Sequence, residues 1–235
     1  MNYEYLTLFE TCLKQPHLLI AGTTGSGKST FIDCLLDCLA LTHDYKNTDL
    51  VLIDPKKVEL SQWKDSPFCI AYSDNQKQTE ILLSKICDIM DNRYNEMKCK
   101  GEKLYSGNEM YVVIDELADL LLSTNRATAK NIEIHLSRLA QLGRAAKIHL
   151  ILATQQIRRK TLPNAIIANI PARIGLRTID ALESKMVIFT AGCEKLKPKG
   201  TCLAYFPETC YPVAVDFSPI PPERLKITTK ASKTA

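Results

Sequence analysis

Short apolar segments alternate with longer amphipathic segments along most of this chain. The short segments are rich in Val, Ile and Leu and are bounded by turn-forming residues, which is typical of β-strands. Several are apolar throughout, as expected of strands covered on both faces of a sheet. We predict strands at His17–Ala21, Leu50–Asp54, Cys69–Tyr72, Tyr111–Asp115, Ile148–Ala153, Ala172–Arg177, Thr201–Phe206 and Val213–Phe217.

The longer segments repeat their apolar positions at helical spacing. They predict helices at Ser29–Leu41, from Gln76 to about Lys98, from about Thr128 to Leu142 and from Ala181 to about Ile188. Strands that alternate with helices in this way form parallel sheets joined by crossover helices. The pattern therefore predicts an α/β fold with a mostly parallel central sheet flanked by helices.

The distribution of apolar residues predicts one domain and a tail. A chain of 235 residues can bury one substantial core, and we expect a single domain over residues 1–220. Residues 221–235 are mainly Lys, Thr, Ser and Ala with little to bury, so we expect a basic, disordered C-terminal tail. Between Lys98 and Met110, Gly, Lys and Asn residues predict an exposed loop.

Composition narrows the class of protein without identifying a function. Hydrophobic residues make up 46% and charged residues 24% of the chain, which is ordinary for a soluble protein. The apolar runs are far shorter than the roughly 20 residues of a membrane-spanning helix, and the N-terminus lacks an export-signal pattern. We therefore expect a cytoplasmic protein with no membrane segment. The nine scattered cysteines then favour reduced thiols, with Cys34 and Cys38 in the core rather than at a zinc site.

A candidate phosphate-binding loop stands between the first apolar strand and an amphipathic helix. Residues 22–29 are Gly-Thr-Thr-Gly-Ser-Gly-Lys-Ser, which fits the G-x-x-x-x-G-K-[ST] pattern of a P-loop. Glycines let backbone N–H groups converge on phosphate oxygens, and the following helix adds the positive end of its dipole. We expect Lys28 to reach the β- and γ-phosphates of ATP and Ser29 to bind Mg²⁺. The expected nucleotide-binding residues are Gly22, Thr23, Thr24, Gly25, Ser26, Gly27, Lys28, Ser29 and Thr30.

A pair of acids ends the apolar strand that begins at Tyr111. Asp115 and Glu116 are expected at the carboxyl edge of the sheet, the same edge as the P-loop. Asp115 would hold Mg²⁺ through water, and Glu116 would polarise the attacking water as the catalytic base. The second acid favours hydrolysis over phosphoryl transfer to a small substrate, because transferases exclude water with a lid.

Three further residues are candidates for two catalytic roles. Gln155 follows the strand at Ile148–Ala153 and would emerge beside the phosphates as a γ-phosphate sensor, the alternative being a solvent-facing turn. Arg144 and Arg138 lie near the end of a predicted helix. The P-loop has no obvious arginine of its own nearby, so one of these would act in the site of a neighbouring subunit. We favour Arg144, the alternative being a surface ion pair with a carboxylate.

Several segments together resemble the motor domain of the FtsK/SpoIIIE family of double-stranded DNA translocases. The P-loop alone indicates only a superfamily, whereas Asp54-Pro55-Lys56 with Glu59, and the run from Arg144-Ala-Ala to Ala153-Thr-Gln, are more specific. The matching segments, in family order, are Pro16–Ser29, Leu52–Leu60, Val112–Leu120, Arg138–Gln155 and Asn169–Gly175.

The resemblance implies a RecA-like P-loop NTPase fold, assembly into a homo-hexameric ring, and ATP hydrolysis that drives duplex DNA through a central channel. It also implies that Arg144 is the intersubunit arginine and that Gln155 senses the γ-phosphate. Residues 156–160 are a candidate DNA loop, because Arg158, Arg159 and Lys160 could meet backbone phosphates. The net charge of +4 is compatible with DNA without arguing strongly for it.

The chain departs from the family pattern at identifiable places. Gln156 replaces the arginine that usually follows Ala-Thr-Gln, and Gly200-Thr-Cys-Leu replaces a customary Gly-Asp-Met-Leu. These changes bear on the DNA loops and the late strands rather than on the ATP site. The chain shows neither an N-terminal membrane-spanning region nor a C-terminal winged helix, so we expect a motor core alone, with any loading or anchoring partner unknown.

We predict an ATP-hydrolysing DNA translocase, acting in DNA segregation or in phage, plasmid or conjugative-element DNA transfer. A secretion-type ATPase that moves protein is an alternative, although such ATPases usually occur as tandem modules in one long chain. A nucleotide-binding adaptor with little hydrolysis is another, against which Glu116 and Arg144 argue. A small nucleotide kinase is disfavoured, because the sequence has no arginine-rich lid segment.

Overall fold

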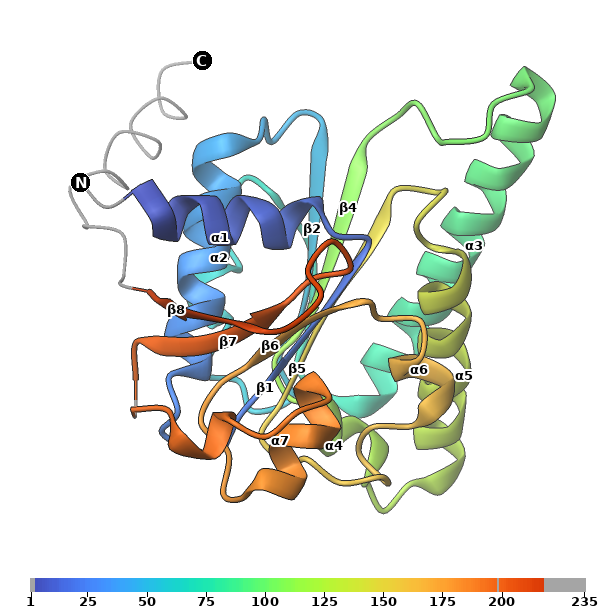
Figure 1. Ribbon diagram of the computed structural model, residues 1–235. Coiled ribbons are helices and arrows are strands. Elements are labelled where there is room, and N and C mark those ends of the chain that lie inside the picture. Colours follow the sequence, from blue (N-terminus) through green and yellow to red (C-terminus); the bar gives the residue numbers. More distant parts are fainter. Residues whose placement is uncertain (1–2, 198, 218–235) are drawn as a thin grey trace.

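The computed structural model describes residues 3–197 and 199–217, with side chains from residue 7 onward. They form an eight-stranded sheet in the order β3-β2-β4-β5-β1-β6-β7-β8 (Figure 1). The pairings from β3 to β6 are parallel, whereas β7 pairs antiparallel with both β6 and β8. The strands are β1 His17–Ala21, β2 Thr48–Ile53, β3 Cys69–Ser73, β4 Glu109–Ile114, β5 Ile148–Thr154, β6 Ala172–Gly175, β7 Thr201–Tyr205 and β8 Val213–Asp216.

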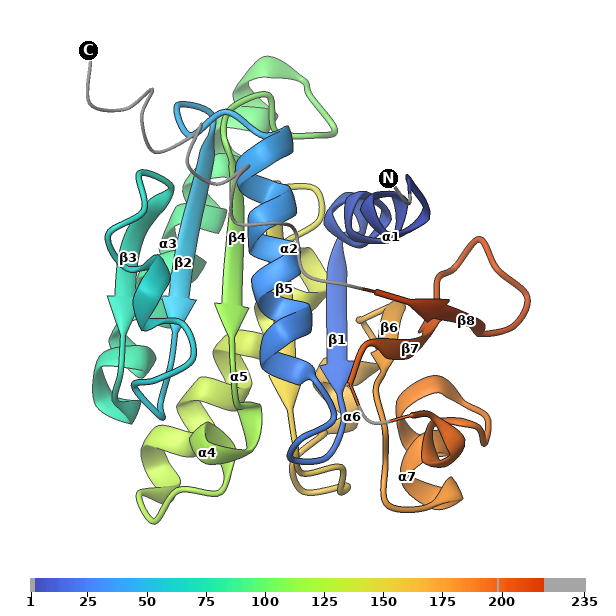
Figure 2. The same cartoon turned by 90° about the vertical axis from the view of Figure 1, so that its left-hand side faces the viewer.

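Helices cover both faces of this sheet. Helices α1 and α2 lie on one face and α3 and α5 on the other (Figures 1 and 2). This layered arrangement confirms the predicted α/β fold with a mostly parallel sheet flanked by helices. The helices are α1 Tyr3–Lys14, α2 Lys28–Thr42, α3 Gln76–Lys100, α4 Leu117–Leu121, α5 Arg126–Leu142, α6 Asn164–Ile167 and α7 Ala181–Ile188, with 3-10 helices η1 Ser61–Trp63 and η2 Cys193–Lys195.

An apolar core lies on each face of the sheet. On one face, the rings of Phe9 in α1 and Phe31 in α2 lie 4.9 Å apart, within the cluster that also contains Leu18 of β1. On the other face, Leu83 of α3 and Leu136 of α5 belong to a second buried cluster. All residues of β1 are buried, because a central parallel strand is covered on both sides. The two cores hold the strand ends, and the loops that follow them, in fixed positions.

Local sequence explains where the longer helices begin and end. The Asn75 side chain accepts a hydrogen bond from the Gln78 N–H at 3.0 Å and caps α3, which ends at Gly101 in a left-handed conformation with φ 69°. The Asp180 side chain likewise accepts from the Glu183 N–H at 2.8 Å and caps α7. These caps satisfy backbone groups that the first and last turns leave unpaired.

The structure differs from the sequence expectations at several elements. Helix α1 was not predicted, although Leu8, Phe9, Cys12 and Leu13 recur at helical spacing and are buried. Helices α4 and α6 span five and four residues, too few for a periodic pattern. Strand β6 ends at Gly175 instead of Arg177, although the Leu176 N–H still donates to the Ala21 carbonyl and the Arg177 carbonyl accepts from Thr23 of the P-loop. The predicted disordered tail at residues 221–235 lies outside the described residues.

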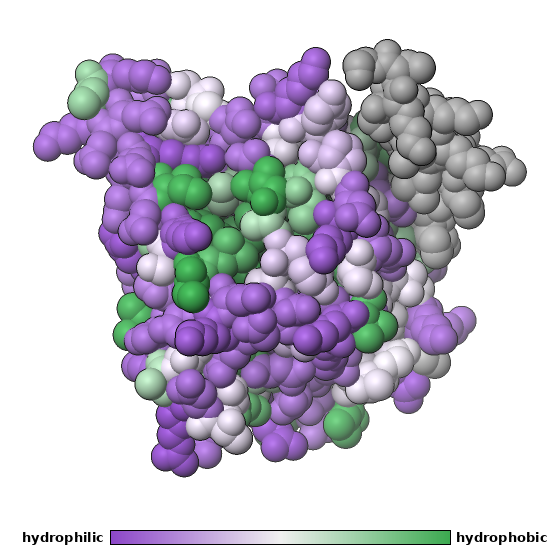
Figure 3. Space-filling view, turned by 180° about the vertical axis from the view of Figure 1, so that it is seen from behind, coloured by the Kyte–Doolittle hydropathy of each residue, from purple (hydrophilic) through white to green (hydrophobic). Residues whose placement is uncertain are grey.

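The surface does not by itself locate a functional site. Strand β3 forms one edge of the sheet, at the back of the view in Figure 1, and that side of the molecule carries an apolar area within a mostly hydrophilic surface (Figure 3). Ile70 of β3 and Ile81 of α3 are 55% and 49% exposed, and single exposed apolar residues are common on soluble proteins. Within the described part of the chain, no helix combines the length and apolar character needed to cross a membrane.

Candidate nucleotide-binding site

The P-loop lies between β1 and α2, at the edge of the sheet where the parallel strands end (Figure 2). Gly27 has φ 97°, a left-handed conformation that favours glycine, and it directly precedes the first turn of α2. Gly22 is needed for close approach, because a Cβ there would lie 2.6 Å from the Leu176 Cβ and 2.7 Å from the Ser26 Oγ. Steric constraints therefore explain why glycine occupies positions 22 and 27 of the motif.

Backbone hydrogen bonds hold the P-loop between the ends of β5 and β6. The Gly22 N–H donates to the Thr154 carbonyl at 3.2 Å, and the Thr23 N–H donates to the Arg177 carbonyl at 2.9 Å. The Thr23 hydroxyl donates to the same Arg177 carbonyl at 3.1 Å. The loop is thus fixed to its neighbours before any ligand binds, with the N-terminus of α2 directed at it.

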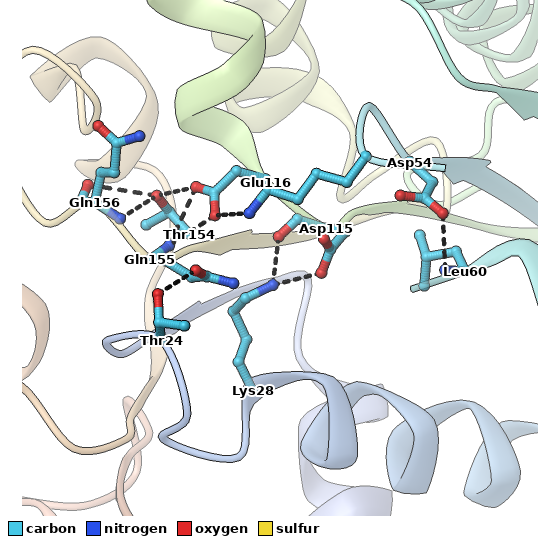
Figure 4. A network of polar contacts seen from close by, with 10 residues as sticks. Thr24, Lys28, Asp54, Leu60, Asp115, Glu116, Thr154, Gln155 and Gln156 are labelled. Atoms are coloured by element: carbon cyan, nitrogen blue, oxygen red, sulfur yellow. Dashed lines mark hydrogen bonds and ion pairs between the residues drawn. The ribbon is translucent and has the colours of Figure 1, made fainter. Parts of the chain in front are cut away.

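Lys28 of the P-loop contacts Asp115 at the end of β4. Its Nζ donates to the Asp115 carbonyl oxygen at 2.8 Å and forms an ion pair with the Asp115 carboxylate (Figure 4). The two side chains are 3% and 0% exposed. Burial raises the pKa of Asp115, and the Lys28 charge opposes that rise. The lysine predicted to bind phosphate and the carboxylate predicted to bind metal therefore share one buried position at the sheet edge.

The residues at this position fit a magnesium ion. Asp115 Oδ2 is buried and has no hydrogen-bond partner among the described residues, and neither has the buried Ser26 Oγ of the P-loop. The described residues contain no group of three or more His, Cys, Asp or Glu that could hold a metal. Such a sparse donor set suits Mg²⁺, which usually binds one or two carboxylates together with waters and substrate phosphates. Ser29, at the start of α2, would contribute its hydroxyl.

The Glu116 carboxylate is 1% exposed and is held by contacts from two directions (Figure 4). Its Oε1 accepts from the Thr154 hydroxyl at 2.7 Å, and both oxygens accept from the Gln155 N–H at 3.1 Å. From the other side, Lys56 Nζ lies 3.3 Å from Oε2. Both carboxylate oxygens are thus bound to groups of the protein.

Asp54 organises the segment that brings Lys56 to this position. Asp54 is fully buried after β2, and its Oδ2 accepts from the Leu60 N–H at 3.0 Å and from the Tyr72 hydroxyl at 3.4 Å. The bond from Leu60 closes residues 54–60 into a loop, and Lys56 extends from this loop toward Glu116. The Asp54-Pro55-Lys56 motif therefore has a structural role that the sequence did not reveal.

Gln155 connects the end of β5 to the P-loop. Its side-chain Oε1 accepts a hydrogen bond from the Thr24 hydroxyl at 2.8 Å (Figure 4), while its backbone N–H donates to Glu116. The next residue, Gln156, has an exposed side chain. The structure thus places Gln155 beside the phosphate-binding loop, and its role as a γ-phosphate sensor stays a prediction.

A cavity of about 350 Å³ adjoins the P-loop. Ile179 brings exposed apolar surface to its wall, and Glu194 brings a carboxylate whose Oε2 accepts from the Gly192 N–H at 2.8 Å. That bond lowers the pKa of Glu194. The cavity thus combines an apolar wall and a charged group directly beside the phosphate site. Its lining residues are Thr23, Thr24, Gly25, Ser26, Arg177, Thr178, Ile179 and Glu194.

The candidate arginines lie apart from this site. Arg144 is exposed in the turn between α5 and β5, and its carbonyl accepts from the Lys147 N–H. Because β5 runs from Ile148 to Thr154 at the site, Arg144 lies at the opposite edge of the sheet, roughly 20 Å away. Arg138 forms an ion pair with Asp91, with Nη2 and Oδ1 2.6 Å apart. Arg138 therefore has the surface pairing considered above, whereas Arg144 has no ion-pair partner among the described residues.

The candidate DNA loop follows Gln155 directly. Ile157 and Leu162 are 3% and 1% exposed and anchor the segment in the core beside α5. Arg158, Arg159 and Lys160 lie between these anchors with exposed side chains. The loop thus exposes three consecutive cationic side chains between two buried, anchored residues.

The comparison with known families identifies this arrangement. A family model described as the FtsK/SpoIIIE family matches residues 7–108 and 99–159. The chain belongs to the FtsK/SpoIIIE family. A curated DNA translocase FtsK from Campylobacter jejuni subsp. jejuni (strain 81-176) is 38% identical over 217 residues, covering 86% of this chain and 22% of that protein. Another, from Streptomyces avermitilis, is 35% identical over 211 residues, covering 80% of this chain and 23% of that protein.

This FtsK/SpoIIIE chain therefore spans less than a quarter of the length of those relatives. Among solved structures, the pCW3 conjugation coupling protein TcpA, in a monomer form with ATPγS, superposes with a TM-score of 0.82 at 27% identity, covering 94% of this chain and 65% of that one. The type VII secretion ATPase EccC of Thermomonospora curvata gives 0.69 at 24% identity, covering 87% and 25%, and shares the fold. The resemblance and the RecA-like P-loop NTPase fold predicted from the sequence are confirmed.

The sequence alone did not identify three residues that contact Glu116 or Gln155. They are Lys56, Thr154 and Thr24 in its hydrogen-bonding role. The signal for Lys56 was present in the Asp54-Pro55-Lys56 motif, which has no role in a generic P-loop enzyme. Thr154 and Thr24 carried no signal beyond their places at a strand end and inside the P-loop.

Proposed function

We propose that this chain is an ATP-hydrolysing motor that moves double-stranded DNA as a ring oligomer. The observation that carries the proposal is the contact of Lys28 with Asp115, with Glu116 next in the chain. A phosphate-binding lysine, a metal-binding acid and a second carboxylate thereby meet at one sheet edge, which is the set that ATP hydrolysis requires. Membership of a family whose relatives are named DNA translocases supports DNA as the substrate.

Each residue at the sheet edge has a defined task in this proposal. Backbone N–H groups of residues 22–30 and Lys28 bind the phosphates, and Ser29 and Asp115 hold Mg²⁺. Mg²⁺, when bound, supplies charge neutralisation on the phosphate oxygens. Glu116 orients the attacking water and accepts its proton, and Gln155 contacts the γ-phosphate from the end of β5. Lys28 must leave the Asp115 carboxylate for the phosphates when ATP binds.

The cavity beside the P-loop is proposed to hold the nucleoside of ATP. Its apolar wall at Ile179 provides a surface for the base, and the Glu194 carboxylate can accept a hydrogen bond from a ribose hydroxyl. The Arg177 carbonyl joins this wall to Thr23 of the P-loop. Phosphates and nucleoside would therefore bind to one connected surface.

The position of Arg144 supports action between subunits. It lies at the edge of the sheet opposite its own P-loop, so within one chain it cannot reach the nucleotide. In a homo-hexameric ring, the Arg144 edge of one subunit would face the P-loop edge of the next. The ring, the cytoplasmic location and a role in DNA segregation or in phage, plasmid or conjugative transfer belong to this proposal.

The test is steady-state ATP hydrolysis by the purified protein, with and without long duplex DNA, using Glu116→Gln as the matched control. We expect duplex-dependent stimulation that is lost in Glu116→Gln, while this variant still binds ATP. Lys28→Ala should fail to bind ATP productively. Mutant-sensitive hydrolysis that ignores DNA would reject the DNA proposal in favour of another cargo, such as protein. No mutant-sensitive hydrolysis in either condition would indicate a nucleotide-binding adaptor.

A further inference from the structure

The orientation of Glu116 conflicts with the task of a catalytic base. A general base needs a lone pair directed at the water that it activates. In the structure, Glu116 Oε1 accepts from the Thr154 hydroxyl at 2.7 Å and Oε2 faces Lys56 Nζ at 3.3 Å, while the Gln155 N–H bridges both oxygens. With 1% exposure, the carboxylate is committed to protein donors on both oxygens. An attacking water therefore competes with these three donors for the carboxylate.

The groups that hold Glu116 come from two separate segments. Thr154 ends β5 and Gln155 follows it, and the exposed cations at residues 158–160 come within a few positions. The Thr154 hydroxyl also accepts from the Gln156 N–H at 3.2 Å, so the first residue of the DNA loop is bonded to the group that holds Glu116. A displacement of this loop would therefore change the hydrogen bond between Thr154 and Glu116.

Lys56 holds Glu116 from the opposite side. It belongs to the loop at residues 54–60, which Asp54 closes through the Leu60 N–H. Its side chain is 37% exposed, so its ion pair with Glu116 is weaker and more easily broken than the buried contacts. Among the groups that hold Glu116, Lys56 is thus the most exposed.

We propose that Lys56 is a positioning residue that, with Thr154 and the Gln155 N–H, holds Glu116 away from the attacking water until DNA engages the loop at residues 156–160. This inference rests on the proposed ATPase function. Release of Glu116 turns its carboxylate toward the nucleotide and starts hydrolysis. DNA stimulation then arises from removal of a restraint rather than from improved ATP binding.

The test compares Lys56→Met with Lys57→Met, a matched control at the next position. Lys57 is exposed, and its Nζ lies 3.5 Å from Asp74 Oδ2, away from Glu116. Each of the two variants removes one positive charge. Lys56→Met should raise kcat without DNA by about 1.4-fold to fivefold, the range that loss of a part-exposed ion pair supports, with KM for ATP unchanged. The ratio of rates with and without duplex should fall correspondingly. Lys57→Met and Lys56→Arg, which keeps the charge, should behave as wild type.

Two results would overturn this role for Lys56. An equal loss of rate with and without DNA in Lys56→Met would make Lys56 a supporting part of the active conformation. A change in KM alone would place it in nucleotide binding. If the wild-type protein hydrolyses ATP without any stimulation by DNA, the proposal that DNA is the substrate is rejected instead. The kcat of Lys56→Met without DNA would then still show whether Lys56 restrains Glu116. Thermal unfolding of each variant, expected to match wild type, verifies that the comparison uses folded protein.

Discussion

The Thr24 hydroxyl donates a hydrogen bond to Gln155 Oε1 at 2.8 Å, which joins the P-loop to the end of β5. Because the Gln155 backbone N–H also binds Glu116, one residue contacts both the phosphate-binding loop and the proposed catalytic base. A ligand that displaces the Thr24 hydroxyl from Gln155 would thus alter the contacts of Glu116. Under the proposed function, this connection would link nucleotide binding to hydrolysis through adjacent groups.

Gln155→Ala should lower kcat about tenfold, equivalent to roughly 1.4 kcal/mol of transition-state stabilisation, because it removes the side chain that is proposed to contact the γ-phosphate. KM should change less, since the P-loop amides and Lys28 remain. The measurement is steady-state ATP hydrolysis with saturating duplex DNA. Gln78→Ala is the control, because that side chain is exposed in the first turn of α3 and its loss should leave both parameters intact. A loss of equal size in the control would contradict a specific role for Gln155.

Arg144→Ala should abolish most hydrolysis, because an arginine supplied between subunits contributes about a thousandfold or more in rate. Mixing Arg144→Ala with Lys28→Ala subunits should restore part of the activity, since each mixed interface can pair an intact P-loop with an intact arginine. Arg138→Ala, which loses a surface ion pair with Asp91, serves as the control and should retain activity. An absence of rescue at every mixing ratio would count against action in trans.

Replacing Arg158, Arg159 and Lys160 together by alanine should weaken duplex binding and reduce its salt dependence. Each lost phosphate contact should lower the slope of log affinity against log salt by roughly 0.9. Binding is measured by fluorescence anisotropy over a salt series. A matched triple variant at Lys98, Lys100 and Lys103, which are exposed near the end of α3, removes the same charge elsewhere. Equal weakening by both variants would show a general charge effect and no DNA loop at this segment.

Stability should fall in acid because of His17. Its imidazole is 2% exposed at the start of β1, and burial lowers its pKa from 6.5 to about 4. The unfolded state therefore binds more protons between these values, so the free energy of unfolding decreases as pH falls from 6.5 toward 4. The full change is about 3 kcal/mol, at 1.36 kcal/mol for each pKa unit.

Urea unfolding at pH values from 7.5 to about 4 measures this change. His17→Gln is the informative variant, because a glutamine oxygen can accept from the Leu150 N–H, which now donates to His17 Nδ1 at 3.1 Å. This variant should show a smaller loss of stability over the same pH range. An identical pH dependence in both proteins would assign the effect to other groups, such as His149, whose pKa burial also lowers.

The sequence by itself determined the features that depend on neighbouring residues. The P-loop from Gly22 to Thr30 is a local motif, and its glycines have the steric roles that the pattern predicts. The apolar character of β1 and β4 and the acids after β4 are likewise local, because a strand buried on both faces must be apolar until it reaches the sheet edge. Family membership also followed from the sequence, since it rests on ordered local motifs.

The tertiary structure alone decided how these motifs meet. Lys56 and Glu116 are 60 positions apart, and Thr24 and Gln155 are 131 apart, so no periodicity or spacing links them in the sequence. The structure also separated Arg144 from the site and paired Arg138 with Asp91, a choice that depends on the packing of α5 against α3. Side-chain contacts between distant segments are set by the strand order of the sheet and the packing of its helices. That arrangement, rather than any local pattern, directs Glu116 toward Thr154 and Lys56.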